Sequence, residues 1–363
     1  MKKYLYYTAV LVGTMTCLVW VNLKIRLISF ADPFGLYLVK LCSTVVGFIL
    51  CERFQIALHE GGHLIAGLLS GYRFISYRVG RMMWMMQDGR LVRRNLSVAG
   101  TAGQCLLEYP GDYEDMPVVL YNLGGVLMNL LSALIFLALV PVIRWYPLQV
   151  FCGLMGACGV FQALMNGIPY QSKIIANDGA NLMSLRNNPA ARYAFRSVLA
   201  VNARLSEGVP YQEIPDELFR NRAEGSRDNT LCESLRVSQA GCLMGAGRRE
   251  EAKALMQELV DGGRILGLHA AVFRADLYCL HMLDNEDVPE ILDADRKLYM
   301  QMKDDPSIIR TLYAEALMKK DEENARTLKE RFERIAAQYP YVQDIMMNRT
   351  MMEDLERRWA DSE

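Results

Sequence analysis

Four stretches in the first half of the chain are long and apolar enough to cross a lipid bilayer, which takes about 20 residues of helix. They cover residues 4–23, 35–69, 117–143 and 148–168. Backbone amides find no water in lipid, so each stretch must satisfy its own hydrogen bonds as a helix. The sequence therefore predicts a mainly α-helical, polytopic membrane protein with about four transmembrane helices in the bilayer.

The first stretch has two interpretations. It follows a short basic segment, as the apolar core of a cleaved signal peptide does. No small-x-small cleavage site follows it, however, and the apolar run is long. These features favour a transmembrane helix that stays in the protein.

Composition changes near residue 190, because the long apolar runs precede this point and most acidic residues follow it. The formal net charge is only −1, which gives no reason to expect nucleic-acid binding. The nine cysteines are scattered, without a CxxC pair, and several lie in apolar segments. They are expected to be reduced thiols, not disulfides or zinc ligands.

Basic residues indicate the orientation of the stretches, since cytoplasmic loops are enriched in lysine and arginine. Residues 71–116 carry six arginines, and further basic residues follow the fourth stretch, whereas the other links carry few. Both termini are therefore expected in the cytoplasm, with the protein in a bacterial cytoplasmic membrane. This orientation also puts the ends of the second and fourth stretches on the same side.

The segment between the second and third stretches predicts short β-strands. Asp88-Gly89 lies between two extended runs, a pattern typical of a β-hairpin. The run 82–86 in this hairpin is rich in methionine and includes Met83 and Met85. Either it rests on the membrane interface, or it is an exposed edge strand in which Met83 and Met85 bind an extended peptide substrate.

One motif stands out in the second stretch, where "HEGGH" places His59, Glu60 and His63 in an otherwise apolar helix. Histidines four residues apart project from one helical face, the arrangement with which HExxH motifs bind zinc. The glutamate of such a motif takes a proton from a metal-bound water. A pair of polar residues facing a water-filled bundle, without a metal, is the alternative.

A catalytic zinc site has three protein ligands, so a third ligand is needed. His269 and His281 lie in the polar second half and are expected to be ordinary helix residues. Asp178 follows the fourth stretch, in an Asp-Gly turn. The predicted orientation carries it to the membrane side of His59 and His63, which makes it the best candidate.

These residues resemble the site-2 protease family of intramembrane zinc metalloproteases, over roughly residues 35–185. Three motifs carry the resemblance, in order along the chain: "HEGGH", "GVLMN" ending at Asn129, and an N-x-x-P…D-G pattern from Asn166 to Gly179. The resemblance implies that Zn²⁺ is bound by three ligands and that one glutamate is the catalytic acid and base. The ligands are His59, His63 and Asp178, and the glutamate is Glu60.

The same resemblance implies that Asn129 and Asn166 lie beside the active site or the substrate. Asn129 has a second interpretation, in which it serves helix packing next to Gly124 and Gly125. Two departures bear on Asp178. The gap after Pro169 is longer than the family shows, and the usual L-D-G-G reads N-D-G-A.

The second half of the chain predicts a soluble helical domain. Three similar segments begin at Ala240, Asp276 and Tyr313, with spacings of 36 and 37 residues. Each reads as an apolar helix, a polar turn and another helix, which resembles a tetratricopeptide array able to bind a cytoplasmic protein partner. A small helical bundle that caps the membrane domain is the alternative.

These observations divide the chain into an N-terminal transmembrane helix and link (1–34), an intramembrane metalloprotease core (35–189) and a cytoplasmic repeat-like domain (190–363). The predicted function is zinc-dependent hydrolysis of peptide bonds near the cytoplasmic face. The substrate would be a membrane-embedded peptide or a single-span protein. The alternative is an inactive membrane scaffold that binds client helices and partners through its repeats.

Overall fold

The computed structural model describes residues 2–172 and 176–360 and is mainly helical. Four of its helices are long and apolar enough to cross a membrane, as predicted. Large apolar side chains are exposed on all four, which suits contact with lipid. These helices are α1 (Lys2–Ile25), α2 (Phe34–Leu69), α3 (Val118–Leu139) and α4 (Tyr146–Gly167).

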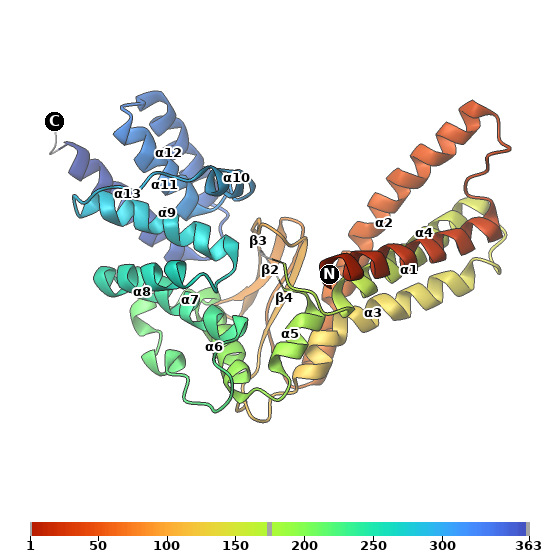
Figure 1. The fold of residues 1–363 in the computed structure, drawn as a ribbon, viewed down its shortest axis with the longest axis horizontal. Coiled ribbons are helices and arrows are strands. Elements are labelled where there is room, and N and C mark those ends of the chain that lie inside the picture. Colours follow the sequence, from red (N-terminus) through yellow and green to blue (C-terminus); the bar gives the residue numbers. More distant parts are fainter. Residues whose placement is uncertain (1, 173–175, 361–363) are drawn as a thin grey trace.

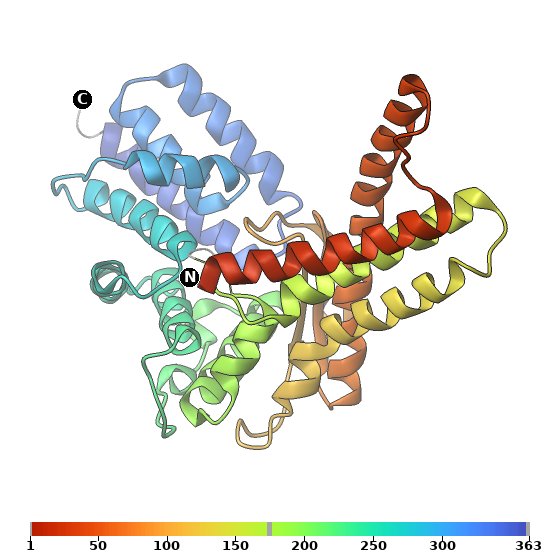
Figure 2. The same ribbon diagram turned by 45° about the vertical axis from the view of Figure 1, so that its right-hand side comes forward.

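The helices alternate in direction, so four of their ends meet on one side of the bundle. The end of α2, the start of α3 and the end of α4 lie beside a small sheet and the C-terminal helices (Figure 1). The start of α1 lies there too, because Tyr6 stacks on Tyr170 just after α4. Figure 2 shows α1 running along α4. The predicted meeting of the second and fourth stretches is therefore confirmed.

Helix α2 has 36 residues and rises about 54 Å at 1.5 Å per residue, well beyond the thickness of a bilayer core. Its first half diverges from the other three helices (Figure 1). Its buried residues begin only at Cys51 and continue to Gly67. The half of α2 that carries the HEGGH motif is thus the half that packs against α3 and α4.

The sheet is antiparallel, with strand order β3-β2-β1-β4. Its strands are β1 (Arg73–Val79), β2 (Met82–Gln87), β3 (Arg90–Asn95) and β4 (Gly103–Glu108). The predicted hairpin is present, and both turn residues, Asp88 and Gly89, have positive φ of 50° and 69°. The edge strands are β3 and β4, so the prediction of an edge strand at 82–86 is wrong.

Met83 and Met85 do not face a membrane or a free edge. Both side chains are fully buried and form a cluster with Leu96. Tyr339 and Tyr341, from the far end of the chain, pack against this cluster. The apolar face of β2 is therefore covered by the C-terminal domain, a partner almost 260 residues away in sequence that no local pattern predicts.

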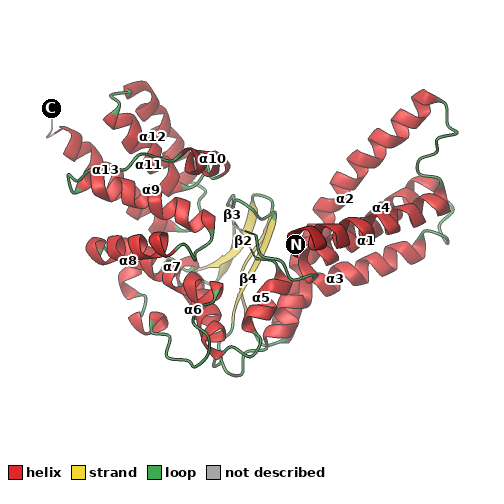
Figure 3. Cartoon of the chain, in the orientation of Figure 1, coloured by secondary structure: helices red, strands yellow, loops and turns green. Residues whose placement is uncertain are grey.

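In the described part of the C-terminal half, helices joined by loops are the only regular secondary structure (Figure 3). Each of the three similar segments spans a helix end and the turn after it, and two of them reach the start of the next helix. The α-helices are α5 (Asp178–Leu185), α6 (Pro189–Ser206), α7 (Thr230–Gly245), α8 (Arg249–Gly262), α9 (Gly267–Leu283), α10 (Asp293–Gln301), α11 (Pro306–Met318), α12 (Glu322–Ala336) and α13 (Val342–Ala360).

Candidate metal centre

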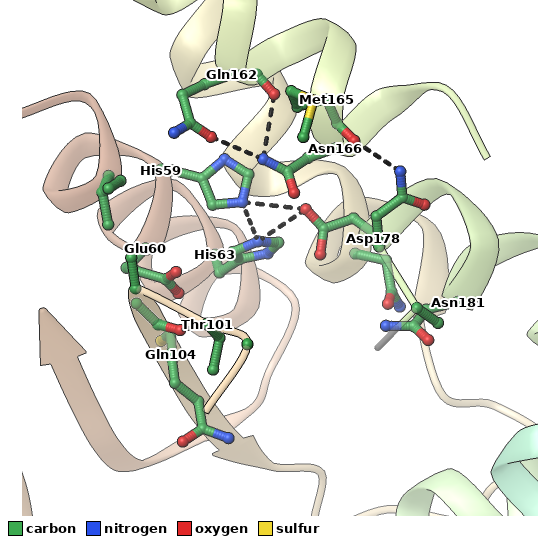
Figure 4. A pocket seen from close by; sticks show the side chains of 18 of the residues that line it. His59, Glu60, His63, Thr101, Gln104, Gln162, Met165, Asn166, Asp178 and Asn181 are labelled. Atoms are coloured by element: carbon green, nitrogen blue, oxygen red, sulfur yellow. Dashed lines mark hydrogen bonds and ion pairs between the residues drawn. The ribbon is translucent and has the colours of Figure 1, made fainter. Parts of the chain in front are cut away.

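Three potential metal ligands converge at the junction of α2 and α5. His59 and His63 lie one turn apart on α2, and Asp178 is the first residue of α5. The two Nε2 atoms are 3.1 Å apart, and Asp178 Oδ2 lies 3.0 Å from Nε2 of His59 and 3.4 Å from Nε2 of His63 (Figure 4). The structure thus brings together the three residues that the sequence singled out.

The other nitrogen of each imidazole has a partner that fixes the tautomer. His59 Nδ1 lies 2.6 Å from Asn129 Oδ1, and His63 Nδ1 lies 2.7 Å from the backbone oxygen of Tyr121. Both partners are carbonyl oxygens and can only accept, so both Nδ1 atoms carry the proton. When the two rings are neutral, each Nε2 atom carries no proton, and its lone pair points toward Asp178.

A buried chain of hydrogen bonds fixes the orientation of the Asn129 amide. Gln55 Nε2 donates to the backbone oxygen of Met155 over 2.8 Å, so Gln55 Oε1 must accept. Asn129 Nδ2 donates to this Oε1 over 2.8 Å, which leaves Asn129 Oδ1 for His59. Asn129 is fully buried and lies behind the histidine, not in the cavity. Gln55 was missed, although it precedes His59 by one helical turn.

The three facing atoms, two Nε2 and one Oδ2, lie close enough together to require a positive charge between them. Asp178 Oδ2 is buried and has no hydrogen-bond partner among the residues that the structure describes. Burial alone would raise the pKa of Asp178, but a positive charge on the facing imidazoles of His59 and His63 lowers it to about 2, so an ionised Asp178 depends on a positive charge at this point. Two lone pairs and a carboxylate oxygen at such distances repel one another unless a cation lies between them.

The donor set suits zinc, since two neutral imidazoles and one carboxylate are ligands of catalytic zinc sites. Gly125 on α3 keeps the space open. A methyl group added there would lie 2.6 Å from Nε2 of both His59 and His63. The residues present therefore fit a bound metal ion, and the glycine of "GVLMN" has a physical role beside them.

Glu60 lies outside the three-ligand cluster and lines a cavity of about 610 Å³ together with His59, His63 and Asp178. A side chain on Gly103, the first residue of β4, would overlap the Glu60 carboxylate. Residues 100–106 border the same cavity. The start of the edge strand β4 therefore runs directly past the candidate acid and base.

Arg78 is a second residue that sequence reasoning missed. In the sequence, it is one of the arginines of a predicted cytoplasmic loop. In the structure, only 1% of the Arg78 surface is exposed, and the residue lies inside the sheet. Its guanidinium donates to the backbone oxygens of Gly80 over 2.7 Å and Gly103 over 3.2 Å. Arg78 thus holds the start of β4 against Glu60. Its position in a strand, with apolar Val79 beside it, was the only available signal.

The side chain of Asn177 explains how the neighbouring Asp178 is held in place. Its amide nitrogen donates to the backbone oxygens of Met165 and Ile168, both over 2.7 Å. Its Oδ1 accepts from the backbone nitrogen of Ala180 over 3.0 Å and so caps α5. Asparagine in the N-D-G-A sequence therefore ties the ligand to the end of α4.

Asn166 lies on α4 and borders the cavity. Its amide nitrogen donates to Gln162, over 3.1 Å to the backbone oxygen and 3.0 Å to Oε1 (Figure 4). Residues 173–175, within the long gap before Asp178, lie outside the described part of the chain. Met83 and Met85 do not border the cavity. Of the four candidate substrate-binding residues, only Asn166 faces it.

The polar site lies where α2, α4 and α5 meet the edge of the sheet, and its ligand atoms are oriented by buried partners. No protein-family model, curated protein or solved structure matches this chain.

Proposed function

We propose that this chain is an intramembrane zinc metalloendopeptidase, similar to the site-2 protease family, that cleaves membrane-embedded peptides near the cytoplasmic face. One observation carries the proposal. His59, His63 and Asp178 direct three potential ligand atoms at one point in a cavity that Glu60 also lines. A non-catalytic scaffold has no need of such a set.

His59, His63 and Asp178 would hold the zinc ion. When bound, zinc supplies Lewis-acid polarisation of a carbonyl and lowers the pKa of a water molecule. Glu60 accepts the proton of the attacking water and delivers it to the leaving amine, the usual work of a general acid and base. Asn129 keeps the His59 ring in one orientation and one tautomer throughout.

The substrate must be extended at the bond that is cut, because the amides of an intact transmembrane helix are bonded internally. Among the described strands, β4 has a sheet neighbour on one side only. An extended peptide laid along its other side would pass Gly103 and the Glu60 carboxylate. We therefore propose that β4, and not Met83 and Met85, has the predicted peptide-binding role.

The arginine-rich segment and the C-terminal helices lie on the side of the bundle where the metal centre opens. The positive-inside rule therefore favours a cytoplasmic position for this side and for both termini. The helix–turn–helix segments of the C-terminal half are consistent with a tetratricopeptide-like domain that receives a cytoplasmic partner.

Purified protein in lipid nanodiscs tests the proposal through zinc content and cleavage of single-span test peptides. We expect about one zinc per chain, and loss of cleavage by a factor of about 10² or more in Glu60→Gln with zinc retained. Glu207→Gln, at the exposed end of α6, is the matched control and should cleave normally. Zinc-free wild-type protein, or unchanged cleavage by Glu60→Gln, rules out this function.

A further inference from the structure

A second cavity, of about 520 Å³, lies between the sheet and the C-terminal domain. Its walls come from residues 96–99, from β4, and from helices α6, α7 and α9. It adjoins the cavity of the metal centre, because the two share part of their lining. The shared residues are Gln104, Leu106, Asn181, Phe195 and Leu199.

Strand β4 connects the two cavities. Gln104 and Leu106 are alternate residues of the strand and so lie on one face of it. Both border both cavities, whereas Gly103, at the start of the strand, borders only the first. A peptide extended beside β4 from the metal centre is therefore led under the C-terminal domain.

The charged side chains that line the second cavity are acidic. Among the described residues that line it, only Asp305 and Asp344 are acidic, and none is lysine or arginine. Burial lowers the pKa of the lining residue His269, which is therefore neutral near pH 7. The cavity thus presents two carboxyl groups and no compensating cation.

Neither carboxyl group has a cationic partner of its own in the described structure. Asp305 Oδ1 accepts from the backbone nitrogens of Ser307 and Ile308 at the start of α11, and Asp344 accepts from the hydroxyl of Tyr211. Arg310 acts on the charge of Asp305 but is paired with another carboxylate, that of Asp276. Burial raises the pKa of both Asp305 and Asp344 to about 6. An ammonium or guanidinium group would relieve this cost.

We propose that the second cavity binds the basic flank of the membrane peptide whose bond is cut at the metal centre. The identity of the peptide rests on the proposed function. Segments of membrane proteins next to the cytoplasmic face are enriched in lysine and arginine, the side chains that match Asp305 and Asp344. The C-terminal domain is then the far wall of the substrate channel and selects substrates by charge.

The test measures binding to the full-length Glu60→Gln protein in nanodiscs, so that cleavage does not interfere. Two fluorescent single-span peptides are compared, identical except that one has three lysines after its membrane segment and the other three glutamines. We expect the lysine peptide to bind about tenfold more tightly. Equal affinity for the two peptides overturns the inference.

Adding Asp305→Asn and Asp344→Asn should abolish the preference, while both side chains keep their accepting oxygens. The matched control, Glu322→Gln with Glu323→Gln, removes the same charge from the exposed start of α12 and should keep the preference. A preference that survives in the Asp305→Asn, Asp344→Asn protein contradicts the inference.

Val272→Trp is a second variant that fills the cavity from α9 without changing its charge. It should weaken binding of the lysine peptide about tenfold. Unchanged binding by a folded Val272→Trp protein counts against the inference, even if the aspartate variants unfold. Wild-type protein that binds with the preference but never cleaves refutes the protease function alone. Cleavage without any preference between flanks refutes only this inference.

Discussion

Gly62 on α2 and Gly124 on α3 lie against each other's backbone, so that a methyl group on either would overlap the carbonyl oxygen of the other. Only two glycines allow α2 and α3 to cross this closely. The crossing brings α3, with Gly125 and Asn129, up to the two histidines. At Gly61, one residue earlier, such a methyl group would meet no described residue within 4 Å.

The two glycines of HEGGH are therefore expected to respond differently to alanine. Gly62→Ala should push α3 away, destabilise the protein by about 1–3 kcal/mol and lower its zinc occupancy. Gly61→Ala should keep full occupancy and gain up to about 1 kcal/mol of helix stability. Thermal unfolding in detergent and zinc analysis of the two variants check this. Equal stability and equal zinc occupancy in the two variants would show that the close crossing of α2 and α3 does not determine the geometry of the metal centre.

Asn129 should matter for zinc affinity, since it orients His59 and has no place in the cavity. We expect Asn129→Leu to weaken zinc binding by about 10- to 100-fold, as loss of a partner behind a ligand typically does. Asn122→Leu is the control, because Asn122 is buried on the same helix and borders the cavity but, among the described residues, donates only to the backbone oxygen of Val118 and not to a candidate ligand. Competition with a zinc-binding dye measures both. Similar affinities in the two variants would refute the orienting role.

Asn177 should likewise act through Asp178. Asn177→Ala removes the bonds to Met165 and Ile168 and the cap of α5, and we expect it to lower zinc affinity by about 10-fold or more. Asn188→Ala removes an equivalent cap from α6 and should cost about 1 kcal/mol of stability without changing zinc affinity. Zinc titration together with thermal unfolding separates the two effects. An Asn177→Ala protein with wild-type affinity would show that Asp178 is held by other contacts.

The parts of the site that are encoded locally could be predicted. The four-residue spacing of His59 and His63 fixes their common face, and the alternating direction of the four long apolar helices brings Asp178 to the same side. The hairpin at Asp88-Gly89 also follows from local rules, because both residues tolerate positive φ. These features depend on helix period, helix direction and turn chemistry alone.

The features that were missed depend on tertiary contacts. In the sequence, Arg78 cannot be distinguished from a loop arginine, because its burial depends on the strands packed around it. The apolar pattern of β4 is too short to predict a strand. Met83 and Met85 form an apolar surface that the C-terminal domain covers with Tyr339 and Tyr341. A sequence pattern shows that such a face must be covered, but it does not show by what.

The raised pKa of Asp344 makes stability depend on pH. Its folded value of about 6 exceeds the usual value of 3.8 because burial raises it, partly opposed by the Tyr211 hydroxyl. Asp305 and Asp276 raise it further. The folded protein then binds more protons than the unfolded chain, so the contribution of this group is present below about pH 4 and is lost as the pH rises through about 6.

Asp344→Asn removes this titration and keeps the Oδ1 acceptor for Tyr211. We expect the variant to match wild type near pH 4 and to be more stable by about 2 kcal/mol at pH 7, where the wild-type carboxyl is ionised at a cost. Unfolding of the C-terminal domain in the full-length protein, followed by circular dichroism at a series of pH values, measures the difference. Glu322→Gln, exposed on α12, should show no such dependence. A variant that tracks wild type at every pH would mean that Asp344 is solvated, and that the second cavity imposes no charge cost for a basic peptide to relieve.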